Sequence, residues 1–209
     1  MNIKTSLTAL TLTAALSAPM ASAEIWGNTE VQIQAGGEFE IVGTGGTATG
    51  TITTFQHAGG WEYGDNFFFV DHSRFSGKGA VGDSSEFYGE WYSNFSLGAM
   101  TGSDLSFGPV KDIGLVAGFN YAPEVDSSWV LPGVTFALDL PGFAFATLNT
   151  SAYIHVSGAQ DTPANGFGIV DEDTSFMVDF AWAYPFKIGS TSWSIEGHLE
   201  YIQGRDQYP

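Results

Sequence analysis

The chain has 209 residues, no cysteine and a formal net charge of −17, from 6 Lys and Arg residues against 23 Asp and Glu residues. This acidic balance argues against nucleic acid or anionic lipid as partners, since both need basic clusters. With no disulfide available, 27 Gly residues and 15% aromatic content, the composition is typical of an all-β protein. The acidity fits either solubility in a salty habitat or an electronegative channel that disfavours anions.

The first 23 residues have the organisation of an export signal. Lys4 supplies a positive charge, residues 7–16 are apolar but diluted with Thr and Ala, and residues 21–23 read Ala-Ser-Ala, a small-x-small cleavage pattern. The apolar stretch is shorter than the roughly 20 residues of a spanning helix. We therefore expect a cleaved signal peptide of residues 1–23 and a single domain of residues 24–209.

Residue character alternates at every step between residues 86 and 97. One set is Glu, Tyr, Glu, Tyr, Asn and Ser, and the intervening set is mostly apolar. A period of two predicts a strand. A strand with one apolar face and one face of acids and tyrosines suits a barrel with lipid outside and water inside.

The same alternation recurs in five later segments, residues 112–120, 134–140, 146–156, 175–184 and 193–201. Between them, Leu140-Pro141-Gly142 predicts a tight turn, and residues 185–189 predict a second short link. Residues 160–174 predict a long acidic connection. Short links alternating with long loops are typical of antiparallel outer-membrane barrels.

The pattern predicts about nine strands after residue 24. Single-chain bacterial barrels generally have an even number of strands, and residues 207–209 are polar rather than part of an aromatic closing strand. We therefore expect an all-β, antiparallel, up-and-down transmembrane β-barrel that lacks its last strands.

Four short sequence segments resemble those of a known family. They are TTFQHAGGWEYGDNFFFVD at residues 53–71, YGEWY at 88–92, DLSFGPVKD at 104–112 and LDLPGF at 138–143. In this order they resemble the Tsx-like nucleoside-specific channel family, which includes OmpK-type outer-membrane proteins, and the similarity covers most of residues 51–200. The resemblance implies a monomeric barrel of roughly twelve strands that passes nucleosides across the Gram-negative outer membrane by facilitated diffusion. It also implies that the loops act as phage receptors in some relatives.

A channel for nucleosides needs aromatic rings for the base and polar groups for the ribose. Stacking of a base on an aromatic ring is worth about 1–3 kcal/mol, and weak binding at several positions suits transport. The inward candidates for stacking are Tyr88, Tyr92 and Tyr153. The inward candidates for hydrogen bonds are Glu86, Glu90, Asn94, Asp112, Asn149, His155, Glu196, His198 and Glu200. For each residue the alternative is an ordinary interior polar group bonded to its neighbours or to water.

Residues 61–71 are apolar on both faces in the middle of the segment. Asp65, Asn66 and Asp71 would reach the channel at its ends, or the segment forms an aromatic girdle with polar ends. Other expected girdle residues are Trp91, Trp182, Tyr184, Trp193 and Tyr201.

The sequence predicts neither an enzyme nor a cofactor. It has no nucleophile elbow or phosphate loop, and the histidines at 57, 72, 155 and 198 do not have metal-ligand spacing. The acidic run at 171–173 lacks the spacing and glycine of a calcium loop. Alternatives to a channel are the same barrel acting as a receptor, adhesion or structural protein, and a secreted sugar-binding β-sandwich.

Overall fold

The structure is a computed structural model that describes residues 10–16, 25–41, 46–77, 83–157 and 174–203. These residues form ten strands, one short α-helix, α1 (Leu97–Thr101), and one 3-10 turn, η1 (Pro123–Val125). The strands are β1 (Leu10–Leu16), β2 (Trp26–Ile41), β3 (Gly46–Trp61), β4 (Gly64–Gly77), β5 (Asp83–Ser96), β6 (Val110–Ala122), β7 (Ser127–Leu138), β8 (Phe145–Ser157), β9 (Ser175–Ile188) and β10 (Thr191–Ile202).

All ten strands belong to one antiparallel sheet in which each strand pairs with its neighbours in the chain. The predicted all-β, up-and-down arrangement is confirmed, and nine of the strands, β2 to β10, follow residue 24. A β-sandwich would divide the strands between two sheets, which this topology does not do. Among the described residues, no helix is both long and apolar enough to cross a bilayer.

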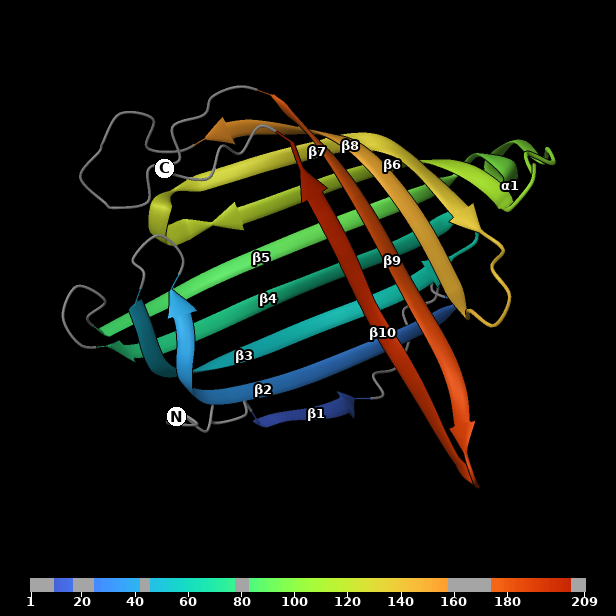
Figure 1. Ribbon diagram of the computed structural model, residues 1–209. Coiled ribbons are helices and arrows are strands. Elements are labelled where there is room, and N and C mark those ends of the chain that lie inside the picture. Colours follow the sequence, from blue (N-terminus) through green and yellow to red (C-terminus); the bar gives the residue numbers. More distant parts are fainter. Residues whose placement is uncertain (1–9, 17–24, 42–45, 78–82, 158–173, 204–209) are drawn as a thin grey trace, which may run out of the picture.

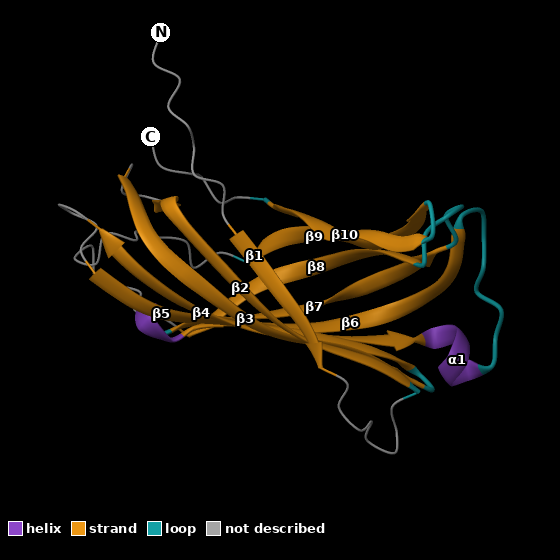
Figure 2. Cartoon of the chain, turned by 90° about the horizontal axis from the view of Figure 1, so that it is seen from below, coloured by secondary structure: helices purple, strands orange, loops and turns teal. Residues whose placement is uncertain are grey.

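The sheet curls into a half-barrel with a concave and a convex face. In Figure 1, β9 and β10 run obliquely in front of β2 to β4, so the last strands lie over the concave side of the first ones. Figure 2, turned by 90°, shows the same curl, with β8 to β10 above β3 to β5. Strand twist of a fixed hand produces this curvature in an extended antiparallel sheet.

Residues that alternate in the sequence lie on opposite faces of the sheet. Residues of the same character line up across neighbouring strands because the register between β4, β5 and β6 is continuous. Tyr92 pairs with Phe67 and Gly118 on the concave face, while Trp91 pairs with Phe68 and Phe119 on the convex face. A slip of one residue would exchange the faces. The large apolar side chains exposed on the convex face are Ile33, Phe55, Val70, Phe87, Trp91, Leu115, Phe119, Tyr121, Phe176, Tyr184, Ile195, Leu199 and Tyr201.

A buried cluster fills part of the concave side. It consists of Trp129, Leu131, Tyr153 and Met177, from β7, β8 and β9, and Tyr92, Ala122 and Ile202 pack against it. The last strand therefore contacts the same cluster as β5, in agreement with the curl of the sheet. Burial of these side chains is the main apolar contribution to stability on the concave side.

The predicted turn at residues 140–142 is confirmed. Phe143 N–H donates to the carbonyl of Leu140 at 3.1 Å, and Gly142 has a positive φ of 87°, which favours glycine. The predicted short link between β9 and β10 is confirmed, but it is shorter than residues 185–189, because β9 continues to Ile188 and only Gly189 and Ser190 separate it from β10. Pro185 is tolerated because the β8 ladder ends at Ala183, leaving β9 with one neighbour there. Apart from Thr174, the expected acidic connection of residues 160–174, with its run at 171–173, lies outside the described residues.

The N-terminal strand coincides with the apolar part of the expected signal peptide. Residues Leu10–Leu16 pair with Thr29 to Ala35 of β2 in an unbroken antiparallel register. In this structure the segment is an edge strand beside β2.

Candidate lumenal site

The concave face of β5 carries the side chains that the alternation placed there. Glu86, Tyr88, Glu90, Tyr92 and Asn94 share this face, because their register partners on β4 are inward residues as well. Burial increases toward the middle of the strand: Glu86 is exposed near one end, whereas Glu90 is only 9% exposed. The centre of β5 therefore presents a carboxylate flanked by two tyrosines.

Four polar side chains at this centre form one hydrogen-bonded group, which we call the tyrosine–carboxylate network. Tyr88 Oη donates to Glu90 Oε1 at 2.5 Å. Asn120 Nδ2 donates to Glu90 Oε1 and to Tyr88 Oη, each at 3.2 Å, and Tyr92 Oη donates to Asn120 Oδ1 at 3.2 Å. Asn120, on β6, is 2% exposed. The network fixes the orientation of both tyrosine rings, because each hydroxyl is held by a neighbour.

Sequence reasoning missed Asn120 as a site residue, although it placed the residue on the correct face. Asn120 pairs with Glu90 across the β5–β6 ladder. Asn120 is recognised as a site residue only when the β5–β6 register is known. That register depends on the length of the connection between the two strands.

Aromatic rings from β4 extend the network. Phe67 and Phe69 lie on the concave face, and the Phe69 ring centroid is 6.0 Å from that of Tyr88. The expectation that residues 61–71 form an outward girdle is therefore wrong for these two rings. Phe68 and Val70 point to the convex face instead.

The facing wall of the concave side is formed by β8, β9 and β10. Asn149, Asp179 and Glu200 are consecutive partners in one row across these strands, and Asn149 Nδ2 donates to Asp179 Oδ2 at 3.3 Å. Glu90 interacts electrostatically with Glu200 and His198. The curl of the sheet thus brings strand β10 within electrostatic range of β5, so the predicted residues from both ends of the chain contribute to one site.

The remaining inward candidates on β8 and β10 are more peripheral to the network. Tyr153 is buried in the apolar cluster, with its ring centroid 5.8 Å from that of Trp129, and the His155 ring lies 5.5 Å from Trp129 on the other side. Glu196 is exposed and pairs with Ala183. Tyr153 therefore serves packing more directly than it serves a solute.

Three predicted residues at the strand ends have local partners. Asn94 Nδ2 donates to Asp65 Oδ1 at 2.8 Å, and Thr54 Oγ1 donates to Asp71 Oδ1 at 2.5 Å, both on the concave face. Asn66 is placed wrongly by the prediction. It pairs with Ser93 on the convex face, and Ser93 Oγ donates to its Oδ1 at 2.6 Å. Adjacent residues of a strand point to opposite faces, so Asn66 cannot join Asp65.

Asp112 lies near the start of β6 and bonds to the neighbouring helix α1. Its carboxylate accepts from the backbone N–H of Gly98 at 3.1 Å and from the hydroxyl of Ser96, so it anchors the start of α1. Asp112 pairs with Ala137 and shares the inward face of β6 with Asn120, and the β-bulge lies beyond it, between Val110 and Asp112. In the loop after α1, hydrogen bonds from Ser106 hold the pKa of Asp104 below its ordinary value.

Most expected girdle aromatics are exposed on the convex face. Trp91 is 56% exposed, and Tyr184, Trp193 and Tyr201 are exposed as well. Trp182 is partly covered because its ring stacks on Phe180 at 5.3 Å. These side chains present amphipathic rings on the convex face of the sheet.

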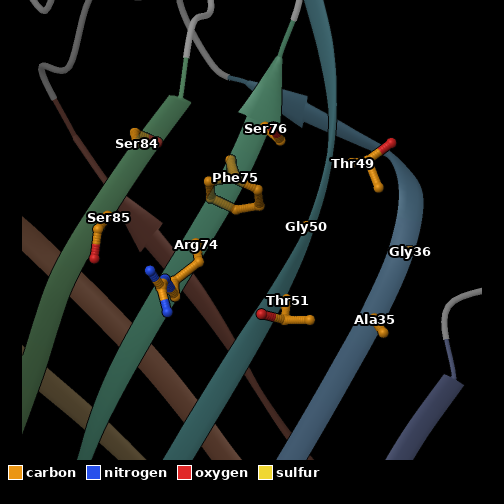
Figure 3. A pocket seen from close by; sticks show the side chains of 10 residues that line it. All are labelled: Ala35, Gly36, Thr49, Gly50, Thr51, Arg74, Phe75, Ser76, Ser84 and Ser85. Carbon is orange, nitrogen blue, oxygen red and sulfur yellow. The ribbon is translucent and has the colours of Figure 1, made fainter.

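A separate hollow of about 710 Å³ lies between β2, β3, β4 and β5, near the ends of these strands. Figure 3 shows Phe75, Arg74, Ser84 and Ser85 around it, and Gly36 and Gly50 on the neighbouring strands also line it. Its lining contains none of the predicted site residues. The hollow is therefore distinct from the tyrosine–carboxylate network.

Comparison of the chain with protein-family models, with curated proteins and with solved structures finds no match.

Proposed function

We propose that the chain is an outer-membrane β-barrel channel that admits nucleosides by facilitated diffusion. The observation that carries this proposal is the tyrosine–carboxylate network on the concave face of a sheet whose convex face is apolar. The resemblance of residues 51–200 to the Tsx-like family supports the same function. Export to the outer membrane follows from the signal-like residues 1–23.

The chemistry of the network suits a nucleoside. The rings of Tyr88 and Tyr92, with Phe69 beside them, offer faces on which a base stacks with little preference for its identity. Glu90 and Asn120 offer oxygen acceptors for ribose hydroxyls. The strands that hold these residues and their neighbours, β4, β5, β6 and β7, contain only Arg74 and Lys111 as Lys or Arg residues, both near strand ends. Such an acidic wall disfavours nucleotides, whose phosphates are anionic.

The convex face supports contact with hydrocarbon. Its exposed large apolar side chains come from β2 to β6 and from β9 and β10 rather than from one edge, and so much exposed apolar surface is rare on water-soluble monomers. The alternation of apolar outward and polar inward residues is that of membrane-spanning strands.

The proposal predicts a current that nucleosides block. The full chain, reconstituted in planar bilayers, should conduct ions, and adenosine or thymidine should reduce the current reversibly as it occupies the network. Ribose alone is the matched control, since it lacks the base that stacks. A conducting channel whose current is unaffected by either nucleoside would contradict the proposal.

A pair of neighbouring substitutions tests which face binds the nucleoside. Tyr92→Ala should raise the half-blocking adenosine concentration roughly 5- to 150-fold, because a lost stack is worth about 1–3 kcal/mol. Trp91→Ala should leave it unchanged, since Trp91 lies on the convex face. Tyr92→Phe keeps the ring, loses the hydrogen bond to Asn120 and should retain most of the block. Equal effects of the two alanine substitutions would exclude this assignment of the faces.

One observation favours a second candidate, a barrel that serves as a surface receptor or structural protein without conducting. Trp129, Leu131, Tyr153 and Met177 fill part of the concave side, and a filled interior obstructs solutes. In the same bilayer experiment this candidate gives membrane-inserted protein with no channel current.

A further inference from the structure

Three groups suited to metal ligation meet on the wall that faces the tyrosine–carboxylate network. The ligand atoms of Asp179, His198 and Glu200 all lie within 4.8 Å of one another. Asp179 and Glu200 are direct partners across the β9–β10 ladder, and His198 is two residues before Glu200, so it points to the same face. The sequence analysis found no metal-ligand spacing, because the group is assembled from two strands.

A second observation points to a ligand at this position. Asn149 is only 6% exposed and pairs with Asp179 on the other side of β9. Its Nδ2 donates to Asp179 Oδ2, yet Asn149 Oδ1 and Asp179 Oδ1 are both buried and have no hydrogen-bond partner in the described part of the chain. Two acceptors without a donor, on adjacent strands, are costly to bury. A cation would satisfy both.

The surroundings also favour a cation. Glu90 interacts electrostatically with Asp179 as well as with His198 and Glu200, so three carboxylates surround one imidazole. Strands β5, β8 and β10 contain no Lys or Arg, and β9 contains only Lys187, near its turn end. Lysine and arginine are thus absent from the middle of these four strands.

We infer that Asp179, His198 and Glu200, with Asn149 hydrogen-bonded to Asp179 on the adjoining strand, bind a divalent transition-metal ion of the zinc class. An imidazole combined with carboxylates suits Zn²⁺, whereas oxygen-only sets suit Mg²⁺ and Ca²⁺. Ligand atoms bound to one Zn²⁺ at about 2.1 Å lie roughly 3.4 Å apart in a tetrahedron. His198 and Glu200 are exposed on the wall, so rotation of their side chains closes the remaining separation.

Isothermal titration of the untagged full chain with ZnCl₂, in detergent micelles, tests the site without relying on transport. One Zn²⁺ should bind per chain. His198→Asn and Glu200→Gln should each weaken binding at least about tenfold, because even changes to groups behind the metal ligands cost roughly 10- to 100-fold. Co²⁺ should give visible absorption bands that disappear in His198→Asn.

Matched controls lie elsewhere on the sheet. His72→Gln changes a histidine of the convex face that bonds to Ser85, and Glu86→Gln changes an exposed carboxylate of β5. Both should bind Zn²⁺ within about twofold of the wild type, and circular dichroism should show that every variant keeps its strands. Absence of one-to-one binding by the wild type would overturn the site. So would equal losses in the controls, or displacement of Zn²⁺ by an equal concentration of Mg²⁺.

Discussion

Leu115→Arg is expected to lower the free energy of unfolding in lipid vesicles by about 2–4 kcal/mol, the cost of placing a charge against the middle of a bilayer on a barrel strand. Leu115 is 50% exposed on the convex face and lies near the middle of β6. Its register partners are Phe95 and Val134, so its surroundings on this face are apolar. Neither of these two partners can pair with an introduced guanidinium.

The matched control is Tyr121→Arg, on the same strand and face but close to its end. There the arginine reaches the interface, and the expected loss is about 0–1 kcal/mol. Reversible unfolding by guanidinium, followed by tryptophan fluorescence in vesicles, measures both variants. If both arginines cost the same small amount, the convex face does not contact hydrocarbon.

Leu131→Ala is expected to destabilise the fold by about 2–5 kcal/mol, the usual cost of emptying a buried leucine site. Leu131 is 0% exposed and lies in the cluster with Trp129, Tyr153 and Met177. The gap would be surrounded by large aromatic and thioether side chains from three strands, which cannot all move to fill it.

Leu115→Ala is the matched substitution on the opposite face. A leucine exposed to lipid contributes only about 0.3–0.6 kcal/mol by the insertion scale, so the expected loss is below about 1 kcal/mol. The same unfolding measurement compares the two alanine variants. A larger loss at Leu115 than at Leu131 would mean that the stabilising core is on the convex side, contrary to the structure.

On the concave face, the same residues contribute to the stability of the fold and to the proposed binding of nucleosides. Tyr92 packs against the buried cluster while its hydroxyl donates to Asn120. Packing on one side and a hydrogen bond on the other hold the ring in one orientation, so it is preorganised for stacking. For this reason Tyr92→Phe removes only the hydrogen bond to Asn120, whereas Tyr92→Ala removes packing and stacking together.

The sequence by itself determined the strands, their faces and one turn. Alternation at residues 86–97 was enough to place Tyr88, Glu90 and Tyr92 on one side and Trp91 on the other, because a strand sends successive side chains to opposite faces. Pro141-Gly142 was enough to locate a turn, since the backbone preferences of these residues are local. The local preference of proline for turns was misleading at Pro185. This residue lies within β9, at a position where the neighbouring strand β8 has already ended.

Only the tertiary structure decided which of the inward residues meet. Asp112 lies on the inward face but bonds to the start of α1, whereas Asn120 joins the network because the ladder sets it beside Glu90. The approach of His198 and Glu200 to Asp179 and Glu90 requires both the β9–β10 register and the curl of the whole sheet. Alternation reports the face of a side chain and carries no information about its distance from a residue on another strand. That distance depends on the twist and the register of every strand pair that lies between the two residues.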